Sequence, residues 1–241
     1  MSIRDRIREH LGGPEEKRAY VRSLFGGIAS RYDLTNDVMS FGLHRRWKRH
    51  ALDLADLPED GRVLDLAAGT GDLAAAAARE TDGAVVALDL TREMLETGID
   101  RHGTDTISWV QGDALDLPFP NRSFDRVLVG YGLRNLADLE AGLGEILRCL
   151  RPGGRLVSLD FARPRSELLR SLYFRYLEAS TAAVGWLLHR DPEAYLYIPE
   201  SLRRFPDQDA LVEMLGEAGF SRYGYVDLLF GTMAVHFAER P

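Results

Sequence analysis

From Gly61 onward, the apolar positions of the chain alternate between two patterns. Short runs rich in β-branched and aliphatic residues predict five strands, at 62–66, 84–88, 107–110, 126–129 and 155–161. Helical patterns lie between several of these runs, at 72–80, 92–100 and 139–150. Strands that are apolar throughout and separated by helices are typical of a parallel sheet covered on both faces. We therefore predict a doubly wound α/β fold.

The C-terminal part of the chain has a different pattern. Residues 223–230 and 232–238 indicate two consecutive strands with a break near Gly231. A terminal hairpin would place one antiparallel strand in an otherwise parallel sheet. The complete prediction is therefore a sheet of about seven strands, of which the last is antiparallel.

Two helical additions accompany the predicted sheet. Ahead of it, apolar residues recur at helical spacing in two successive helices, at Val21, Leu24, Phe25, Ile28 and Tyr32, then at Leu43, Trp47, Ala51 and Leu54. After the fifth strand, residues 165–190 carry a broad apolar stripe opposite charged positions. We expect residues 1–57 to form an N-terminal helical segment. Residues 58–241 would form the main domain, with a helical insertion at about 165–206.

Composition excludes several classes of protein. The 241 residues carry a formal net charge of −7, which argues against a nucleic-acid binder. A single cysteine, Cys149, excludes an internal disulfide, and six histidines without paired ligand spacing predict no metal site. The charged N-terminus does not resemble a signal peptide. The sequence contains no run of about 20 apolar residues, so it predicts no membrane span. We expect a cytoplasmic protein that would meet a membrane only from the side.

A glycine-rich turn marks the first candidate site. Residues 63–71, VLDLAAGTG, predict a strand that ends in a tight turn and opens a helix. Gly69 and Gly71 would let a ligand approach the backbone closely, and the start of the helix offers unpaired N–H groups. These glycines alone do not exclude a nicotinamide dehydrogenase, because Gly69-x-Gly71-x-x-Ala74 also satisfies the looser dinucleotide-binding pattern.

Three aspartates, within or at the ends of three successive predicted strands, narrow the choice of cofactor. Asp65 lies inside the first strand, where it would orient the loop or meet the amino group of a methionine moiety. Asp89 ends the second strand, from which a carboxylate can accept hydrogen bonds from two ribose hydroxyls. Asp113 follows the third strand and could accept the adenine amino group. A single aspartate is more often a solvated loop residue, but this ordered array favours S-adenosylmethionine.

Two longer runs are more specific than the glycine turn. Residues 31–49 read RYDLTNDVMSFGLHRRWKR and residues 131–136 read YGLRNL, and a third match covers 199–208. On these runs, the chain resembles the ubiquinone/menaquinone biosynthesis C-methyltransferase family from about Phe25 to nearly the C-terminus. The resemblance implies a Rossmann-like class I methyltransferase fold, S-adenosylmethionine as cofactor and a prenylated quinol as substrate.

Together, the strand ends and the resemblance predict the cofactor contacts. The resemblance itself implies contacts at Thr70, Asp89, Asp113 and Ala114, and at Gly130, where the family often has a serine. The full predicted set is Asp65, Ala67, Gly69, Thr70, Gly71, Asp89, Leu90, Asp113, Ala114 and Gly130. The missing hydroxyl at Gly130 would leave at most a backbone contact there.

The resemblance also places Arg134 and Asn135 at the quinol. Methylation needs an electron-rich ring, and a free phenol has a pKa of about 10, so the site must favour the phenolate. Arginine stays protonated, so we expect Arg134 to stabilise the developing phenolate and Asn135 to orient the ring oxygen. The alternative for Arg134 is a surface residue paired with Asp138. His44 and Tyr32 are candidates for the base, although His44 would equally suit a surface basic run and Tyr32 the core.

Several questions remain open from the sequence. The substrate is expected to be a demethylmenaquinol, with a polyprenyl benzoquinol as the alternative; a non-catalytic cofactor-binding subunit is the alternative of another class. The helix within 165–188 would either cover the prenyl tail or pack on the sheet. The basic run at 44–50 would either touch anionic lipid at the inner face of the membrane or remain solvated. A homodimer is a further expectation about partners.

Overall fold

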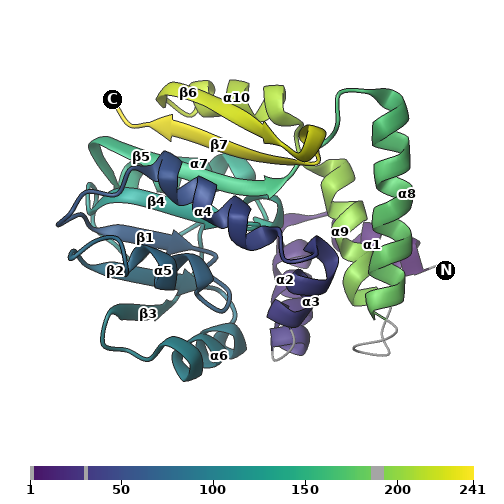
Figure 1. Ribbon diagram of the computed structural model, residues 1–241, viewed down its shortest axis with the longest axis horizontal. Coiled ribbons are helices and arrows are strands. Elements are labelled where there is room, and N and C mark those ends of the chain that lie inside the picture. Colours follow the sequence, from purple (N-terminus) through teal and green to yellow (C-terminus); the bar gives the residue numbers. More distant parts are fainter. Residues whose placement is uncertain (1–2, 30–31, 186–192) are drawn as a thin grey trace.

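A seven-stranded sheet forms the centre of the computed structural model, which describes residues 3–29, 32–185 and 193–241 (Figure 1). The strands lie in the order β3-β2-β1-β4-β5-β7-β6. Their bounds are β1 Val63–Leu66, β2 Val85–Asp89, β3 Ile107–Gln111, β4 Phe124–Gly130, β5 Leu150–Phe161, β6 Ser221–Leu228 and β7 Met233–Glu239. Strands β1 to β5 are parallel, and β7 is antiparallel to both β5 and β6. The predicted mostly parallel sheet with its last strand antiparallel is confirmed.

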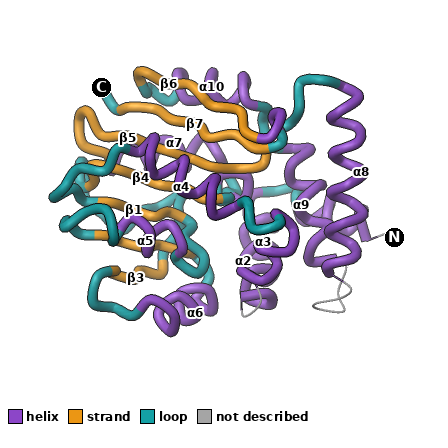
Figure 2. The backbone as a smooth tube through the Cα atoms, viewed as in Figure 1, coloured by secondary structure: helices purple, strands orange, loops and turns teal. Residues whose placement is uncertain are grey.

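Helices cover both faces of the sheet because their apolar sides pack on its buried strands. On one face lie α4 (His44–Ala55) and α5 (Asp72–Ala77), and on the other lie α7 (Leu139–Cys149) and α10 (Gln208–Glu217) (Figure 2). Helix α6 (Arg92–His102) packs beside β2 and β3. Strand residues such as Leu64, Val127 and Leu159 are fully buried between these layers. Burial on both faces explains why the strands show no alternation of polar and apolar residues.

The remaining long helices lie together beyond the carboxyl ends of the parallel strands (Figure 1). They are α1 (Ile3–His10), α2 (Pro14–Ile28), α3 (Tyr32–Ser40), α8 (Glu167–Val184) and α9 (Glu193–Arg204). Helix α8 packs mainly on α9 and α3, and its Tyr173 hydroxyl donates to the Thr232 carbonyl oxygen just ahead of β7. Within the described ranges, no helix is long and apolar enough to cross a bilayer. This helical group stands over the edge at which an α/β sheet binds its ligands.

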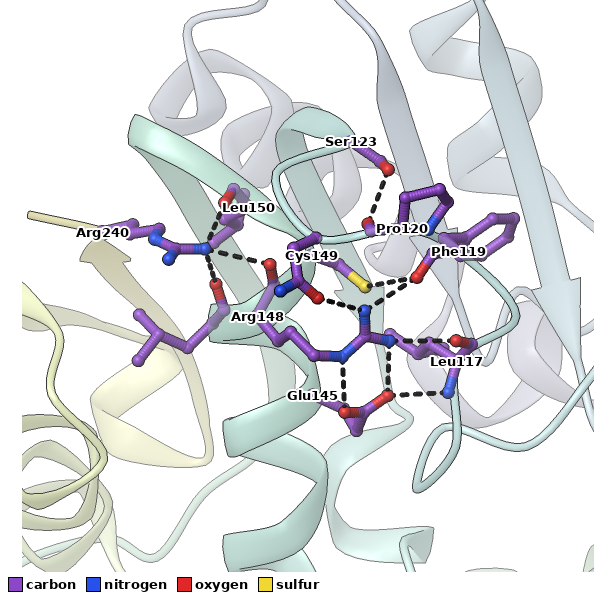
Figure 3. Close-up of polar contacts among 11 residues, drawn as sticks. Leu117, Phe119, Pro120, Ser123, Glu145, Arg148, Cys149, Leu150 and Arg240 are labelled. Carbon is purple, nitrogen blue, oxygen red and sulfur yellow. Dashed lines mark hydrogen bonds and ion pairs between the residues drawn. The ribbon is translucent and has the colours of Figure 1, made fainter.

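The opposite end of the sheet is fastened by two arginines (Figure 3). Arg148, near the end of α7, donates to the carbonyl oxygens of Phe119 and Leu117 at 2.7 and 3.0 Å and pairs with Glu145 at 2.7 Å. Glu145 in turn accepts the Leu117 N–H at 2.8 Å. Arg240 donates to the last carbonyl oxygens around α7, those of Leu147, Arg148 and Leu150. The bonds of Arg148 hold the connection between β3 and β4, and those of Arg240 hold the junction between α7 and β5.

Candidate active site

The turn after β1 is shaped by left-handed backbone. Ala67, Gly69 and Gly71 have φ values of 55°, 56° and 79°. A Cβ atom on Gly71 would lie 2.3 Å from the ring of Trp109, so only glycine fits there. Gly71 is also the N-cap of α5 and provides no side chain to cap it. The turn therefore depends on packing against β3 and on another residue for its cap.

Asp65 supplies that cap from within β1. Its side chain is only 1% exposed, and its Oδ2 accepts the Ala74 N–H at 2.8 Å, in the first turn of α5. Burial raises the pKa of Asp65 to about 7. Of the two roles expected for Asp65, the structure places it where it orients the loop. Asp65, Thr70 and Gly71 do not line the cleft described next.

A cleft of about 720 Å³, including its open side, lies along the carboxyl ends of β1, β2, β3 and β4. Seven of the residues predicted to contact the cofactor line it: Ala67, Gly69, Asp89, Leu90, Asp113, Ala114 and Gly130. Asp89 connects the turn after β1 with the start of α6, because its two carboxylate oxygens accept hydrogen bonds from the N–H groups of Gly69 and Thr91, each at 2.8 Å. Burial raises the pKa of Asp89. The carboxylate also accepts hydrogen bonds from the Thr91 side chain and the Leu90 N–H, so it is fixed in place at the end of β2 beside the cleft.

Helix α2 closes the other side of this cleft. Its Arg18, Val21 and Phe25 line the cleft, and Arg18 forms an ion pair with Asp113 at 2.8 Å. Asp113 also accepts the Leu115 N–H at 3.0 Å. The sequence prediction missed Arg18, because no local signal connects it with a strand end almost a hundred positions later.

A second and largely apolar cavity adjoins the cleft. It measures about 1160 Å³ with its open mouth and is walled by α2, α3, α4, α8 and α9. Phe25 and Tyr131 line both this cavity and the cleft. Tyr131 has a left-handed φ of 61° and is buried at the end of β4. The two spaces therefore meet at these two side chains, as a transfer between two bound molecules would require.

Arg134 lies in the wall of this second cavity, in the short helix η2 (Leu133–Asn135). Its Nη1 is 2.5 Å from Oδ1 of Asp160 and donates to the Tyr131 carbonyl oxygen at 2.9 Å. The guanidinium stacks over the ring of Phe161 at 4.9 Å. Both Arg134 and Asp160 are only 4% exposed at their side chains. The alternative of a surface arginine paired with Asp138 is wrong, since Asp138 caps α7.

Asn135 is fixed between two tyrosines. Its Nδ2 donates to the Tyr131 carbonyl oxygen, and its Oδ1 accepts the hydroxyl of Tyr197, both at 3.0 Å. Asn135 lines the cofactor cleft, whereas Tyr197 lines the apolar cavity. Burial raises the pKa of Tyr197 far above neutrality, so its hydroxyl stays protonated and can act as this donor. The predicted role of Asn135 in orienting a ring oxygen stays a prediction.

His44 is buried in the apolar cavity, so the alternative of a surface residue is wrong. Ser40 donates its hydroxyl to the Asn36 carbonyl oxygen at 2.6 Å and can therefore only accept from Nδ1 of His44, 2.8 Å away. This hydrogen bonding places the proton of neutral His44 on Nδ1. Nε2 then carries a lone pair, and Asp37 is 3.8 Å from it. Burial lowers the pKa of His44, which favours the neutral form.

Tyr32, the other candidate base, begins α3, but its side chain lies outside the described residues. Sequence reasoning also missed Asp160, Tyr131, Ser40 and Tyr197. For Asp160 a signal did exist: an acidic residue at the end of an apolar strand, the same pattern that singled out Asp89. Tyr131 and Ser40 lie within the runs 131–136 and 31–49 that carry the family resemblance, but nothing distinguished them inside those runs. Tyr197 had no distinguishing pattern, because a tyrosine near apolar positions is common in any core.

The chain is similar in sequence to a known family of methyltransferases. The ubiE/COQ5 methyltransferase family matches residues 14–240 of the chain. The chain is 42% identical over 235 residues to the ubiquinone/menaquinone biosynthesis C-methyltransferase UbiE of Pseudomonas putida, which covers 95% of this chain and 92% of that protein. It is 44% identical over 230 residues to the protein of the same name from Methylococcus capsulatus, at 92% and 93% coverage.

Solved structures show the same fold at low sequence identity. A SAM-dependent methyltransferase from Thermotoga maritima has a TM-score of 0.65 at 20% identity and covers 92% of this chain and 100% of that one. Phosphoethanolamine N-methyltransferase 2 of Haemonchus contortus, solved in complex with S-adenosyl-L-methionine, has a TM-score of 0.61 at 17% identity, with 81% and 52% coverage. These two structures support the fold of the sheet and its helices.

Proposed function

The chain belongs to the ubiE/COQ5 methyltransferase family, and from that premise we propose that it methylates a ring carbon of a demethylmenaquinol. One observation carries the proposal. An apolar cavity that holds Arg134 and His44 adjoins the cofactor cleft through Phe25 and Tyr131. A prenylated ring suits a cavity of this size and lining, and its oxygens would find the two polar side chains there.

The cleft fits S-adenosylmethionine, the cofactor of this class of enzyme. Asp89 presents a buried carboxylate at the end of β2, where a ribose would bind, and Gly69 permits close approach of the backbone. Asp113 lies at the end of β3, where its carboxylate could accept an adenine amino group. When bound there, the cofactor supplies an electrophilic methyl group. The protein's own task is to hold a nucleophilic ring carbon in line with it.

Arg134 would favour the nucleophilic form of the quinol. The ring carbon gains nucleophilicity as a neighbouring hydroxyl loses its proton, and a guanidinium in an apolar cavity stabilises the resulting oxyanion. Asp160 and Phe161 hold the guanidinium in place, so little reorganisation is needed when charge develops. Arg134 itself is not a proton acceptor, because guanidinium remains charged in proteins.

His44 is the group that we assign as proton acceptor. Its Nδ1–H is committed to Ser40, so Nε2 is the nitrogen that can take the phenolic proton. After the new carbon–carbon bond forms, the hydrogen on the methylated ring carbon also leaves as a proton. The ring oxygen takes a proton back as the ring becomes aromatic again, so each turnover releases one net proton to solvent, and His44 returns to its neutral form when that proton leaves.

A methyl-transfer assay with labelled S-adenosylmethionine tests the proposal. Chemically reduced demethylmenaquinol and reduced polyprenyl benzoquinol are offered in separate reactions. Label is expected in the demethylmenaquinol and should be lost in Arg134→Ala. Arg222→Ala serves as the matched control, because Arg222 is exposed on β6 and its pair with Glu239 is far from the cavity.

Two results would contradict the proposal. Label in the benzoquinol alone would reassign the ring that is methylated. Cofactor binding measured by calorimetry, together with an absence of label in either reduced quinol, would reject both quinols as substrates and favour a non-catalytic binder. Binding of NAD in place of S-adenosylmethionine would reject the cofactor itself.

A further inference from the structure

An apolar rim surrounds the mouth of the substrate cavity. We use this name for six exposed side chains: Phe41, Leu168, Leu172, Tyr176, Leu229 and Phe230. Phe41, Tyr176 and Leu229 also line the cavity. Leu168 and Leu172 precede Tyr176 on α8, and Phe230 follows Leu229 in the β6–β7 turn. Figure 1 shows the α3–α4 connection, α8 and this turn together on one side of the molecule. Leu34 and Val38 extend the exposed apolar surface along α3.

The two phenylalanines of the rim are unusual in both exposure and backbone. Phe41 is 81% exposed and Phe230 is 83% exposed. Their φ values are 51° and 57°, and that of Leu229 is 47°, in the left-handed region that is unfavourable for residues with a Cβ. Asparagine or glycine would suit these turns better and would not expose an aromatic ring to water. Large apolar side chains in such turns indicate a surface that contacts an apolar partner.

Basic side chains border the rim. Arg45, Arg46 and Arg49 lie on the outer side of α4 and share a surface hollow with Leu229. Arg45 pairs with Asp37 at 2.9 Å and Arg49 with Glu80 at 3.0 Å, while Arg46 is exposed. The chain as a whole has a net charge of −7, so this concentration of arginines is local. Apolar side chains bordered by arginine suit the surface of an anionic bilayer, where cations meet headgroups and apolar side chains reach the acyl region.

We propose that the apolar rim seats this protein on an anionic lipid bilayer, with the substrate cavity opening toward the membrane. The inference rests on the proposed function in one respect, because a prenylated quinol resides in the bilayer. Seated in this way, the cavity mouth would receive the prenyl tail without exposing it to water. A second copy of the chain fits this surface less well. A two-fold contact would bring the arginines of both copies together and would close the mouth of the cavity.

Vesicle co-sedimentation tests directly whether the apolar rim binds the bilayer. The full chain is mixed with vesicles of phosphatidylcholine, with and without phosphatidylglycerol. The double variant Leu168→Gln/Phe230→Asn removes two rim side chains that do not line the cavity, and asparagine tolerates the left-handed φ at 230. We expect its vesicle partition to fall by about tenfold or more. Ile99→Gln is the control, since Ile99 is an exposed apolar residue on α6.

A charge reversal tests the basic border. Arg46→Glu should abolish the preference for phosphatidylglycerol, while Arg122→Glu, an exposed arginine in the connection ahead of β4, should keep it. Equal vesicle binding by the wild type and the rim variant would overturn the proposal. So would a wild-type dimer in analytical ultracentrifugation that the rim variant converts to a monomer, since the rim would then be a subunit interface.

Activity separates this proposal from the proposed function. The rim variant should lose methyl transfer to a prenylated quinol in vesicles but retain transfer to a short-chain, water-soluble quinol. A wild type that methylates the soluble quinol without binding vesicles would reject the membrane seat alone. If the wild type binds vesicles through the rim but methylates neither quinol, the proposed function is rejected and the proposed membrane contact is supported.

Discussion

Asp160 at the end of β5 holds Arg134 of η2 in a buried ion pair, with 2.5 Å between Oδ1 and Nη1. The Asp160 carboxylate also accepts the backbone N–H of Phe161 at 2.8 Å. Because β4 and β5 are neighbouring parallel strands, their carboxyl ends bring the two side chains together. The pair lies in the wall that separates the sheet from the substrate cavity, so it links the stability of the fold with the chemistry of the site.

Asp160→Asn should lower both stability and activity. Breaking a buried pair leaves an uncompensated charge, which costs about 3–5 kcal/mol in the free energy of unfolding. The freed guanidinium would also lose its orientation, and we expect kcat/KM to fall by at least about tenfold. The double variant Arg134→Met/Asp160→Leu should recover most of the stability in urea unfolding and none of the activity. Wild-type stability and turnover in Asp160→Asn would show that the pair has neither role.

Two aspartates with the same substitution should affect cofactor binding differently. Asp89→Asn turns an NH₂ group toward one of the two N–H donors of the cleft, so the dissociation constant for S-adenosylmethionine should rise by about tenfold or more. Asp65→Asn keeps an oxygen for the Ala74 N–H and should change the dissociation constant for S-adenosylmethionine by less than about threefold. Isothermal titration calorimetry measures both. A larger effect at Asp65 would place its side chain at the cofactor.

The pH dependence of turnover should report His44. A proton acceptor works in its neutral form, and burial lowers the pKa of His44, so kcat/KM should be constant near neutrality and fall with acid below about pH 6.5. His44→Gln should reduce kcat by about a hundredfold or more and remove this acid limb. Ser40→Ala should also reduce kcat, because Nδ1 loses its acceptor.

The control for this profile is His50→Gln, a histidine of the same basic run that does not line the cavity. It should keep both the rate and the acid limb of the wild type. An unchanged acid limb in His44→Gln would show that another group accepts the proton.

Arg148→Met should destabilise the fold without changing the site. The substitution leaves the carbonyl oxygens of Leu117 and Phe119 without this donor and strips Glu145 of its partner. We expect a loss of about 2–4 kcal/mol in the free energy of unfolding, measured by urea titration. Arg222→Met, at an 83% exposed side chain, should stay within about 0.5 kcal/mol of the wild type. Equal effects would mean that the network in Figure 3 contributes little.

Much of the fold was accessible from local pattern. The strands at 62–66 and 84–88 were predicted to within one residue at either end, because buried parallel strands form continuous apolar runs. The fifth strand was predicted from 155, whereas β5 begins at Leu150. Residues 151–154 include proline and two glycines, which favour a turn locally, and pairing with β4 at Phe124 extends the strand beyond that signal.

The sequence by itself determined the sheet, the cofactor edge and the family, because these depend on periodicity and on motifs that are contiguous in the chain. Only the tertiary structure decided which polar groups share a cavity. Asp160 joins Arg134 across 26 positions, Arg18 reaches Asp113 across a cleft, and His44 is buried despite its basic neighbours. Such contacts arise from the packing of separate elements, which no local pattern encodes. The apolar rim has the same origin: its residues come from three distant segments, and packing alone leaves them exposed around one mouth.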